Sequence, residues 1–405
     1  MKKILLRVIL ISFAMSIVAC GGDEKKSVGK EKKENAIAVD KHLTHVLDSF
    51  ATAPRCSGKF GLYVYDLTAE KPVYAMNEKE GIPSASCMKL LSGVAGLKLL
   101  GTKYLYHTSI YTHGKMDSDT LRGDVSFKAD LDPQLQDEDM KQFAQALRRK
   151  GIKKIDGRLI IDLFLKEPVK SEAHWYPWDL SFSKYGVIYK GPERVKHALK
   201  GAIRAAGIQL KDDQVVFARV PKGSHCIYRY CSGINKVIRR MWKNSSNTKA
   251  TSLLYTIGKR VNPKVNPTEA GVLYLRNFLH KEIGVTDSTL VVHDGCGLCT
   301  HNHLSAEALV KILDYGYRDK AIFNYLWNYL AISGVDGTLA RFGYELRGKV
   351  HAKTGTLSHP YGISSLAGYC KAQNGHLLAF AIMDSEMSVL DAHVLQRKLC
   401  KILVK

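Results

Sequence analysis

The sequence predicts a mixed α/β protein of the α+β kind, in which strands form hairpins and helices pack on them. Residues 61–76 hold two strand-like runs around a polar turn at residues 68–71, which is the pattern of a hairpin. Residues 140–150 form an amphipathic helical run. The chain has 405 residues, 45% of them hydrophobic and 24% charged, which is ordinary for a globular protein with a large core and one or two domains.

The remaining elements follow in chain order. Strand-like and helical runs alternate with glycine-rich and polar turns, and Gly207 closes one of the helices. We expect strands over 108–112, 120–128, 158–162, 365–369 and 377–383, and helices over 140–150, 195–206, 268–283 and 389–403.

The N-terminus predicts export. Lys2 and Lys3 precede an apolar stretch over 4–18 that is too short for a comfortable membrane span, so residues 1–19 read as a secretory signal. The ending Ile-Val-Ala-Cys resembles a bacterial lipobox, which predicts cleavage before Cys20 and lipid on its thiol. An ordinary signal peptide with an incidental cysteine is the alternative. Residues 20–44 read as a flexible, charged tether to the membrane, on the periplasmic side, with the leaflet left open.

The net charge of +22 suits an anionic partner such as nucleic acid, a membrane surface or an anionic polymer. Basic residues are spread along the chain and no nucleic-acid motif is present, so we expect no nucleic acid partner. Nine cysteines are many, and an exported chain can form disulfides. Cys226 and Cys231 flank a hairpin-like Ile-Tyr-Arg-Tyr and are the pair that we join most readily; other connectivities stay open.

The segment over 82–95 carries a candidate nucleophile. Ser86 and Lys89 stand three apart, hence on one face of a helix beginning near Ser86, where a neutral amine could take the hydroxyl proton. Lowering a lysine pKa from about 10.4 to 7 or 8 takes roughly 4 kcal/mol, which an enclosed, positively charged pocket can supply. Ser-x-x-Lys also begins at Ser27, Ser181 and Ser246, but only Ser86 follows a proline and precedes a long apolar run. A helix start with Ser86 as N-cap is the alternative.

Two later motifs carry polar groups that could line a binding or catalytic site. Ser245 and Asn247 place a hydroxyl and an amide two residues apart. Lys353-Thr354-Gly355 on a strand sets an ammonium, a hydroxyl and a bare backbone edge side by side, the parts needed to hold a substrate carboxylate and an extended peptide.

Ser-x-x-Lys, Ser-x-Asn and Lys-Thr-Gly in this order are the mark of penicillin-recognising serine enzymes. With its surroundings, the chain from about Gly61 to its C-terminus resembles the DacB-type D-alanyl-D-alanine carboxypeptidases/endopeptidases, the class C low-molecular-mass penicillin-binding proteins. The segments that carry the resemblance begin at Pro83, Leu121, Asp132, Asp156, Asp294, Gly334 and Ala352.

This resemblance implies a serine β-lactamase/DD-transpeptidase-like fold, an antiparallel sheet flanked by helices with an inserted α/β subdomain. About 155 residues separate Lys89 from Ser245, fewer than many relatives have, so we expect a trimmed insert. The expected domains are the peptidase over 45–104 and 229–405, and the insert over 105–228.

The implied reaction is acyl transfer from peptidoglycan stem peptides, with β-lactams as covalent inhibitors and without metal or organic cofactor. Ser86 attacks a D-Ala-D-Ala carbonyl, Lys89 is the base and Ser245 relays a proton. Asn247 holds the substrate amide, Lys353 supplies positive potential, and Thr354 and Thr356 beside Gly355 bind the carboxylate. Backbone N–H groups of Ser86 and Thr356 form the oxyanion hole.

The sequence departs from this family at several positions and leaves alternatives open. Cys87, Cys296 and Cys299 stand where relatives often have Ser or Thr, Thr251 stands where an acid is common, and residues 358–361 are extra. The run Cys296-x-x-Cys299-Thr-His301-Asn-His303 could instead bind zinc or act in redox chemistry. A serine β-lactamase and a catalytically silent wall-binding lipoprotein remain alternative functions, and carboxypeptidase against endopeptidase preference stays open.

Overall fold

The computed structural model describes residues 38–55, 57–172, 174–176 and 184–405. The predicted signal sequence, Cys20 and most of the predicted tether lie outside the described residues. Residues 41–44 of that tether belong to helix α1 (Lys41–Thr52). Asp40 is the N-cap of this helix, because its carboxylate accepts from the N–H groups of His42 and Leu43. None of the described helices is long and apolar enough to cross a membrane.

One of the sheets has six antiparallel strands in the order β11-β12-β13-β14-β1-β2. The predicted hairpin is confirmed as β1 and β2, and β1 pairs with β14 from near the C-terminus. The strands are β1 (Lys59–Asp66), β2 (Lys71–Met76), β11 (Ala331–Ile332), β12 (Val350–Leu357), β13 (Ile363–Lys371) and β14 (Leu377–Ser385).

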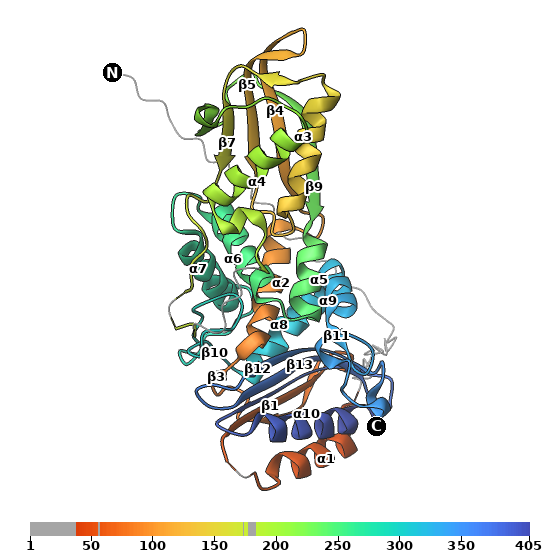
Figure 1. Ribbon diagram of the computed structural model, residues 1–405. Coiled ribbons are helices and arrows are strands. Elements are labelled where there is room, and N and C mark those ends of the chain that lie inside the picture. Colours follow the sequence, from red (N-terminus) through yellow and green to blue (C-terminus); the bar gives the residue numbers. More distant parts are fainter. Residues whose placement is uncertain (1–37, 56, 173, 177–183) are drawn as a thin grey trace, which may run out of the picture. The chain divides into compact units, whose positions relative to one another are not determined.

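Helices cover both faces of this sheet, because its central strands are apolar on both sides. Along β14, Phe380 and Ile382 pack in one cluster with α1 and α10 (Val389–Leu403), while Ala381 and Met383 pack in another with α2 (Met88–Leu100) and α8 (Ala306–Arg318). Figure 1 shows α1 and α10 below the sheet and α2 and α8 above it. The expected antiparallel sheet flanked by helices is therefore confirmed.

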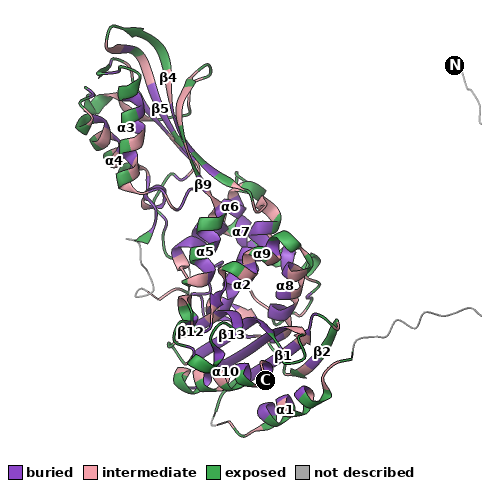
Figure 2. Ribbon diagram, turned by 90° about the vertical axis from the view of Figure 1, so that its right-hand side faces the viewer, coloured by how far each residue is buried: buried purple, intermediate pink, exposed green. Residues whose placement is uncertain are grey.

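Helix α2 lies at the centre of the upper helical layer. Every residue from Met88 to Leu97 is buried, which explains why this stretch is apolar all round (Figure 2). Its neighbours are α5 (Ile234–Lys243), α6 (Asn247–Val261), α7 (Pro267–Lys281) and α9 (Lys320–Tyr329).

A second sheet is built from the middle of the chain, in the order β8-β7-β5-β4-β9, with β6 beside β5. Helices α3 (Met140–Arg149) and α4 (Pro192–Ala205) pack on it around Phe127, Phe143 and Leu199. The strands are β4 (Leu105–Asp117), β5 (Thr120–Ala129), β6 (Lys154–Ile155), β7 (Leu159–Leu163), β8 (Val215–Phe217) and β9 (His225–Gly233). This sheet spans most of the expected insert, but β9 continues beyond the expected boundary at residue 228.

Short elements connect these parts. A two-stranded pair joins β3 (Ile82–Pro83) to β10 (His303–Leu304). The 3-10 turns are η1 (Ala85–Cys87), η2 (Asp137–Asp139), η5 (Val187–Lys190), η6 (Asp212–Gln214), η7 (Gly337–Leu339) and η8 (Tyr344–Leu346).

The expected disulfide between Cys226 and Cys231 is wrong. Both residues lie on the single strand β9, where they pair with Tyr111 and His107 of β4. Five residues of extended chain span about 16 Å, whereas bonded cysteines have Cα atoms about 4.4–6.8 Å apart. Each of the seven described cysteines is a free thiol.

Candidate active site

The turn that carries Ser86 follows the short strand β3 and packs against Gly297. Residues 84–87 follow β3 and pass through the 3-10 turn η1 into α2, so Ser86 lies just before the α-helix rather than in it. Ala85 has a positive φ of 42°, and a Cβ on Gly297 would lie 1.8 Å from the Ala85 carbonyl oxygen. The turn is thus packed directly on the loop around residue 297, and Ser86 remains partly exposed.

Lys89 is fully buried beneath Ser86 and bonded to three oxygen atoms. Its Nζ donates to Ser86 Oγ at 2.7 Å, to Asn247 Oδ1 at 2.7 Å and to the Cys296 carbonyl at 2.5 Å. Burial lowers the pKa of Lys89, because the charged form is desolvated. The predicted Ser86–Lys89 pair is therefore present, with the amine shifted toward the neutral form that a base requires.

A single buried carboxylate shapes the loop that contributes the Cys296 carbonyl. Asp294 accepts five hydrogen bonds at 2.5 to 3.0 Å, from the backbone N–H groups of Cys296, Gly297 and Cys299 and the side chains of Asn302 and Trp175. These bonds fold residues 294–299 tightly, so the position of the third Lys89 acceptor depends on Asp294.

The second motif lies in the connection between α5 and α6. Ser246 is the N-cap of α6 and accepts from the Lys249 N–H, while its neighbour Ser245 has a φ of 56°. This conformation brings Ser245 and Asn247 to the same site: Asn247 accepts from Lys89, and Ser245 Oγ accepts from Lys353 Nζ at 2.9 Å.

The third motif lies on β12. Lys353 is fully buried, and burial, with a smaller effect of nearby Lys89, lowers its pKa to about 7. Its Nζ also donates to the Thr354 carbonyl at 2.5 Å. A Cβ on Gly355 would lie 2.7 Å from the Ser84 carbonyl oxygen and 3.1 Å from the Cys87 nitrogen, so the glycine allows β12 to approach the nucleophile turn.

One edge of β12 is open beside these residues. Strand β11 pairs only with His351 and Ala352, so from Lys353 to Leu357 no described strand continues on that side. Thr356 is exposed there, and Thr354 Oγ1 donates to Thr338 Oγ1 at 2.8 Å. An open strand edge can pair with an extended peptide.

Three contributors were missed by sequence reasoning. The Trp242 indole donates to the Lys89 carbonyl at 2.7 Å and fills the space left by Gly93, where a Cβ would lie 2.4 Å from the ring. Asp294 and Thr338 stand in segments that carry the family resemblance, which was the available signal. Trp242 had no comparable signal.

Four of the residues that depart from the family pattern are buried, whereas the extra residues 358–361 are exposed. Cys87 donates to the Lys353 carbonyl at 3.2 Å, and burial raises its pKa, so it is a packed thiol. Cys296, Cys299 and Thr251 are likewise almost fully buried. Cys296 contributes to the site through its backbone carbonyl.

The zinc alternative finds no support in the geometry. Among the described residues, no group of three or more His, Cys, Asp or Glu side chains is placed to hold a metal ion. In the Cys-x-x-Cys-Thr-His-Asn-His run, Cys299 Sγ lies 3.9 Å from His301 Nδ1, and His303 Nδ1 contacts the His301 carbonyl.

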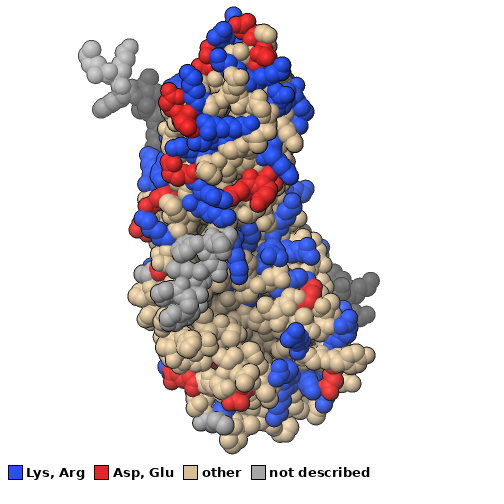
Figure 3. All heavy atoms as spheres, in the orientation of Figure 1, with Lys and Arg blue, Asp and Glu red and all other residues tan. Residues whose placement is uncertain are grey.

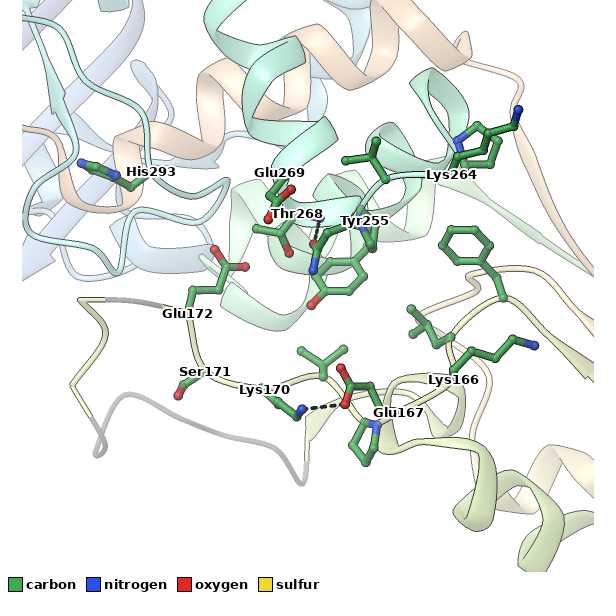
Figure 4. Close-up of a pocket in the computed structure, with 18 of the residues that line it drawn as sticks. Lys166, Glu167, Lys170, Ser171, Glu172, Tyr255, Lys264, Thr268, Glu269 and His293 are labelled. Atoms are coloured by element: carbon green, nitrogen blue, oxygen red, sulfur yellow. Dashed lines mark hydrogen bonds and ion pairs between the residues drawn. The ribbon is translucent and has the colours of Figure 1, made fainter.

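Ser245 and Asn247, which contact Lys353 and Lys89, line a hollow of about 280 Å³ together with Leu298 and others. We call this space the catalytic hollow. A separate hollow of about 700 Å³ lies between residues 164–172 and the start of α7 (Figure 4). Glu172 and Glu269 line it, and burial together with nearby Asp294 raises the pKa of Glu172 to about 8. None of the three motifs lines this hollow beside α7.

The chain is similar to known cell-wall peptidases. It is 21% identical over 384 residues to D-alanyl-D-alanine carboxypeptidase DacB of Haemophilus influenzae, covering 73% of this chain and 79% of that protein. It is 30% identical over 201 residues to a D-alanyl-D-alanine carboxypeptidase of Actinomadura sp. (strain R39), covering 47% of this chain and 36% of that protein.

Solved structures share the fold. Penicillin-binding protein 4 (dacB) of Haemophilus influenzae matches with a TM-score of 0.75 and 18% identity, over 89% of this chain and 99% of that one. A predatory endopeptidase of Bdellovibrio bacteriovorus matches with a TM-score of 0.60 and 16% identity, over 85% and 92%. The model of one family covers residues 43–186 and 187–404, and the resemblance seen in the motifs is thereby confirmed: the chain belongs to the D-Ala-D-Ala carboxypeptidase 3 (S13) family.

Proposed function

We propose that the chain is a serine DD-peptidase that hydrolyses D-Ala-D-Ala bonds of peptidoglycan through an acyl-enzyme. One observation carries the proposal: Lys89 Nζ bonds both Ser86 Oγ and Asn247 Oδ1, while Lys353 Nζ bonds Ser245 Oγ. Residues far apart in the chain thus form two hydrogen-bonded groups of proton donors and acceptors, one of which includes the partly exposed Ser86.

In the acylation step Lys89 is neutral, so its Nζ donates to Asn247 and the Cys296 carbonyl and accepts from the Ser86 hydroxyl. It takes that proton as Oγ attacks the carbonyl carbon. The buried amine is suited to this role, because desolvation favours its neutral form. The backbone N–H groups of Ser86 and Thr356 would stabilise the oxyanion, and Asn247 would hold the substrate amide.

The leaving amine needs a proton, and Ser245 is placed to pass one on. Its hydroxyl accepts from Lys353 Nζ at 2.9 Å, which holds it in place. The proton that Ser245 gives to the amine would be replaced by the one that Lys89 took from Ser86, so that Lys89 becomes neutral again before deacylation. Water then attacks the acyl carbon with Lys89 again as base, which releases the shortened peptide and restores Ser86.

Recognition of the substrate's terminal carboxylate falls to β12. Lys353, Thr354 and Thr356 would bind the carboxylate, and the open edge beside Gly355 would pair with the peptide. With its pKa lowered to about 7, Lys353 is poised between charge states, and an arriving carboxylate favours the charged form.

For the rest of the chain we propose the arrangement expected from the sequence. The peptidase domain would consist of residues 45–104 and 229–405, interrupted by an insert over 105–228. Lipid on Cys20 would hold the exported enzyme at the membrane, near its peptidoglycan substrate and accessible to β-lactams.

Mass spectrometry of purified muropeptides after incubation with the protein tests this proposal. We expect products shortened by D-Ala or split at D-Ala crosslinks, and a covalent adduct with fluorescent penicillin. Ser86→Ala should abolish both, whereas Ser246→Ala, which changes the serine of another Ser-x-x-Lys, should leave the penicillin adduct detectable. Products and adduct that persist in Ser86→Ala would refute the assignment. Fast turnover of a chromogenic cephalosporin without muropeptide cleavage would favour a β-lactamase instead.

A further inference from the structure

A second, larger hollow opens directly beside the catalytic one. It has a volume of about 970 Å³ and shares Lys184, Arg240, Ser246 and Thr248 with the catalytic hollow. Because these four residues line both spaces, a peptide that fills the catalytic hollow can continue into the second one.

The charged residues that line the second hollow are all Lys or Arg. Lys184, Lys236, Arg239, Arg240 and Lys249 line it, and no described Asp or Glu does. Figure 3 shows Lys and Arg side chains gathered at the level of α5. The site would therefore attract an anionic group and repel a cationic one.

The charge arises from the amphipathic character of α5. Val237, Ile238 and Met241 turn inward to the core, so Lys236 and Arg239 stand on the opposite, exposed face, three residues apart. Lys243, one turn on, is neutralised by Asp336. Lys236, Arg239 and Arg240 form no ion pair with any acid in the described part of the chain.

The floor of the hollow contains a buried lysine. Lys249 of α6 is almost fully buried and donates to the Pro133 carbonyl, which ties the floor to the segment before α3. Burial lowers the pKa of Lys249 to about 8. Lys236, Arg239 and Arg240 are exposed, and of these Lys236 and Arg239 do not line the catalytic hollow. Neither of the two contacts a catalytic side chain in the hydrogen bonds of the described residues.

We propose that this basic hollow, formed by Lys184, Lys236, Arg239, Arg240 and Lys249, binds carboxylates of the substrate on the N-terminal side of the scissile bond, and so selects acidic peptides. The inference rests on the proposed DD-peptidase function. If the terminal carboxylate is held on β12, the remainder of the peptide must leave the catalytic hollow by another side, and the shared residues Arg240 and Lys184 mark that exit.

The test compares two synthetic peptides that end in D-Ala-D-Ala and differ only in Glu or Gln at the two preceding positions. The ratio of their kcat/KM values measures the acidic preference. Two exposed cations should together favour the acidic peptide on the order of 10-fold at low salt, with the preference falling in 0.5 M NaCl.

Lys236→Gln/Arg239→Gln should reduce this ratio to about 1 to 2. Arg148→Gln/Arg149→Gln, which removes the same charge from exposed positions of α3, should leave the ratio unchanged. Lys236→Glu/Arg239→Glu should invert the ratio and favour a matching Lys peptide, a change that loss of structure cannot produce.

The outcomes are separable. A ratio near 1 in the wild type, or a ratio that the α5 substitutions do not alter, overturns the inference while leaving the DD-peptidase intact. Inhibition by inorganic phosphate with equal rates for both peptides would also overturn it, in favour of a phosphate-containing polymer. No hydrolysis of either peptide and no penicillin adduct would refute the proposed function and the inference together.

Discussion

The substitution Asp294→Asn tests whether the loop over 294–299 positions Lys89. The carboxylate accepts five N–H donors, and an amide has one oxygen and one NH₂ group in its place. If the amide oxygen keeps the three donors of Oδ1, its NH₂ faces the N–H of Cys299 and the indole of Trp175, which both lose their acceptor.

The magnitude follows from these bonds. Hydrogen bonds to a charged group contribute about 1.5 to 3 kcal/mol each, so two lost bonds cost about 3 to 6 kcal/mol. Part of this cost falls on folding stability, which lowers the melting temperature by about 5 °C. Displacement of the Cys296 carbonyl removes one acceptor of Lys89, and 1.4 to 2.7 kcal/mol on the acylation barrier corresponds to about 10- to 100-fold in rate.

The assay is the second-order rate constant of acylation by fluorescent penicillin, measured with the melting temperature of the same samples. Asp287→Asn is the matched control, because Asp287 accepts only the Thr289 N–H through its side chain, outside the site. Acylation by Asp294→Asn within threefold of the wild type would refute the argument that this loop positions Lys89.

Three further predictions follow from individual contacts. Cys87→Thr should keep penicillin acylation within about threefold, since a threonine hydroxyl can also donate to the Lys353 carbonyl; loss of acylation with an unchanged melting temperature would implicate the thiol. Lys353→Met should raise the melting temperature most near pH 6. The pKa of Lys353 is about 7 in the folded state and about 10.4 in the unfolded state. The buried charge therefore destabilises the fold fully below pH 7, and this destabilisation fades as the pH rises toward 10. A melting-temperature difference between the variant and the wild type that is constant from pH 6 to 10 would contradict this. Gly355→Ala should slow acylation more than 10-fold, because its Cβ would lie 2.2 Å from Ser365 Oγ. Gly201→Ala is the control and should not slow acylation, because there is open space around Gly201. Equal acylation rates for the two variants would show that β12 can move away from Ser365.

The local part of the site could be predicted from the sequence, because it depends on short spacings. Ser86 and Lys89 are three residues apart in a helical turn, and this spacing alone brings the two side chains to one face. The run after Lys89 is apolar in the sequence, and α2 is buried along that run. The hairpin of β1 and β2 and the helix over 389–403 were predicted on the same local basis.

Cysteine pairing was mispredicted because sequence proximity was taken for spatial proximity. Cys226 and Cys231 are close in the chain, but an extended strand carries them far apart. A strand and a hairpin differ in whether the chain turns back, and the residues between these cysteines do not by themselves decide that.

Other features of the site were decided by tertiary structure. Lys89 and Asn247 are 158 positions apart, and Lys353 and Ser245 are 108 apart, so only the packing of α2, α6 and β12 brings their polar atoms within hydrogen-bond distance. The Cys296 carbonyl and the Asp294 carboxylate act through loop geometry, which residue types do not reveal. Burial, which lowers the pKa values of Lys89 and Lys353, likewise exists only once the surrounding elements exclude water. The sequence by itself thus determined which chemical groups are present and which near neighbours share a face, while the fold determined their solvent exposure and their long-range partners, because desolvation and contact depend on the whole packed chain.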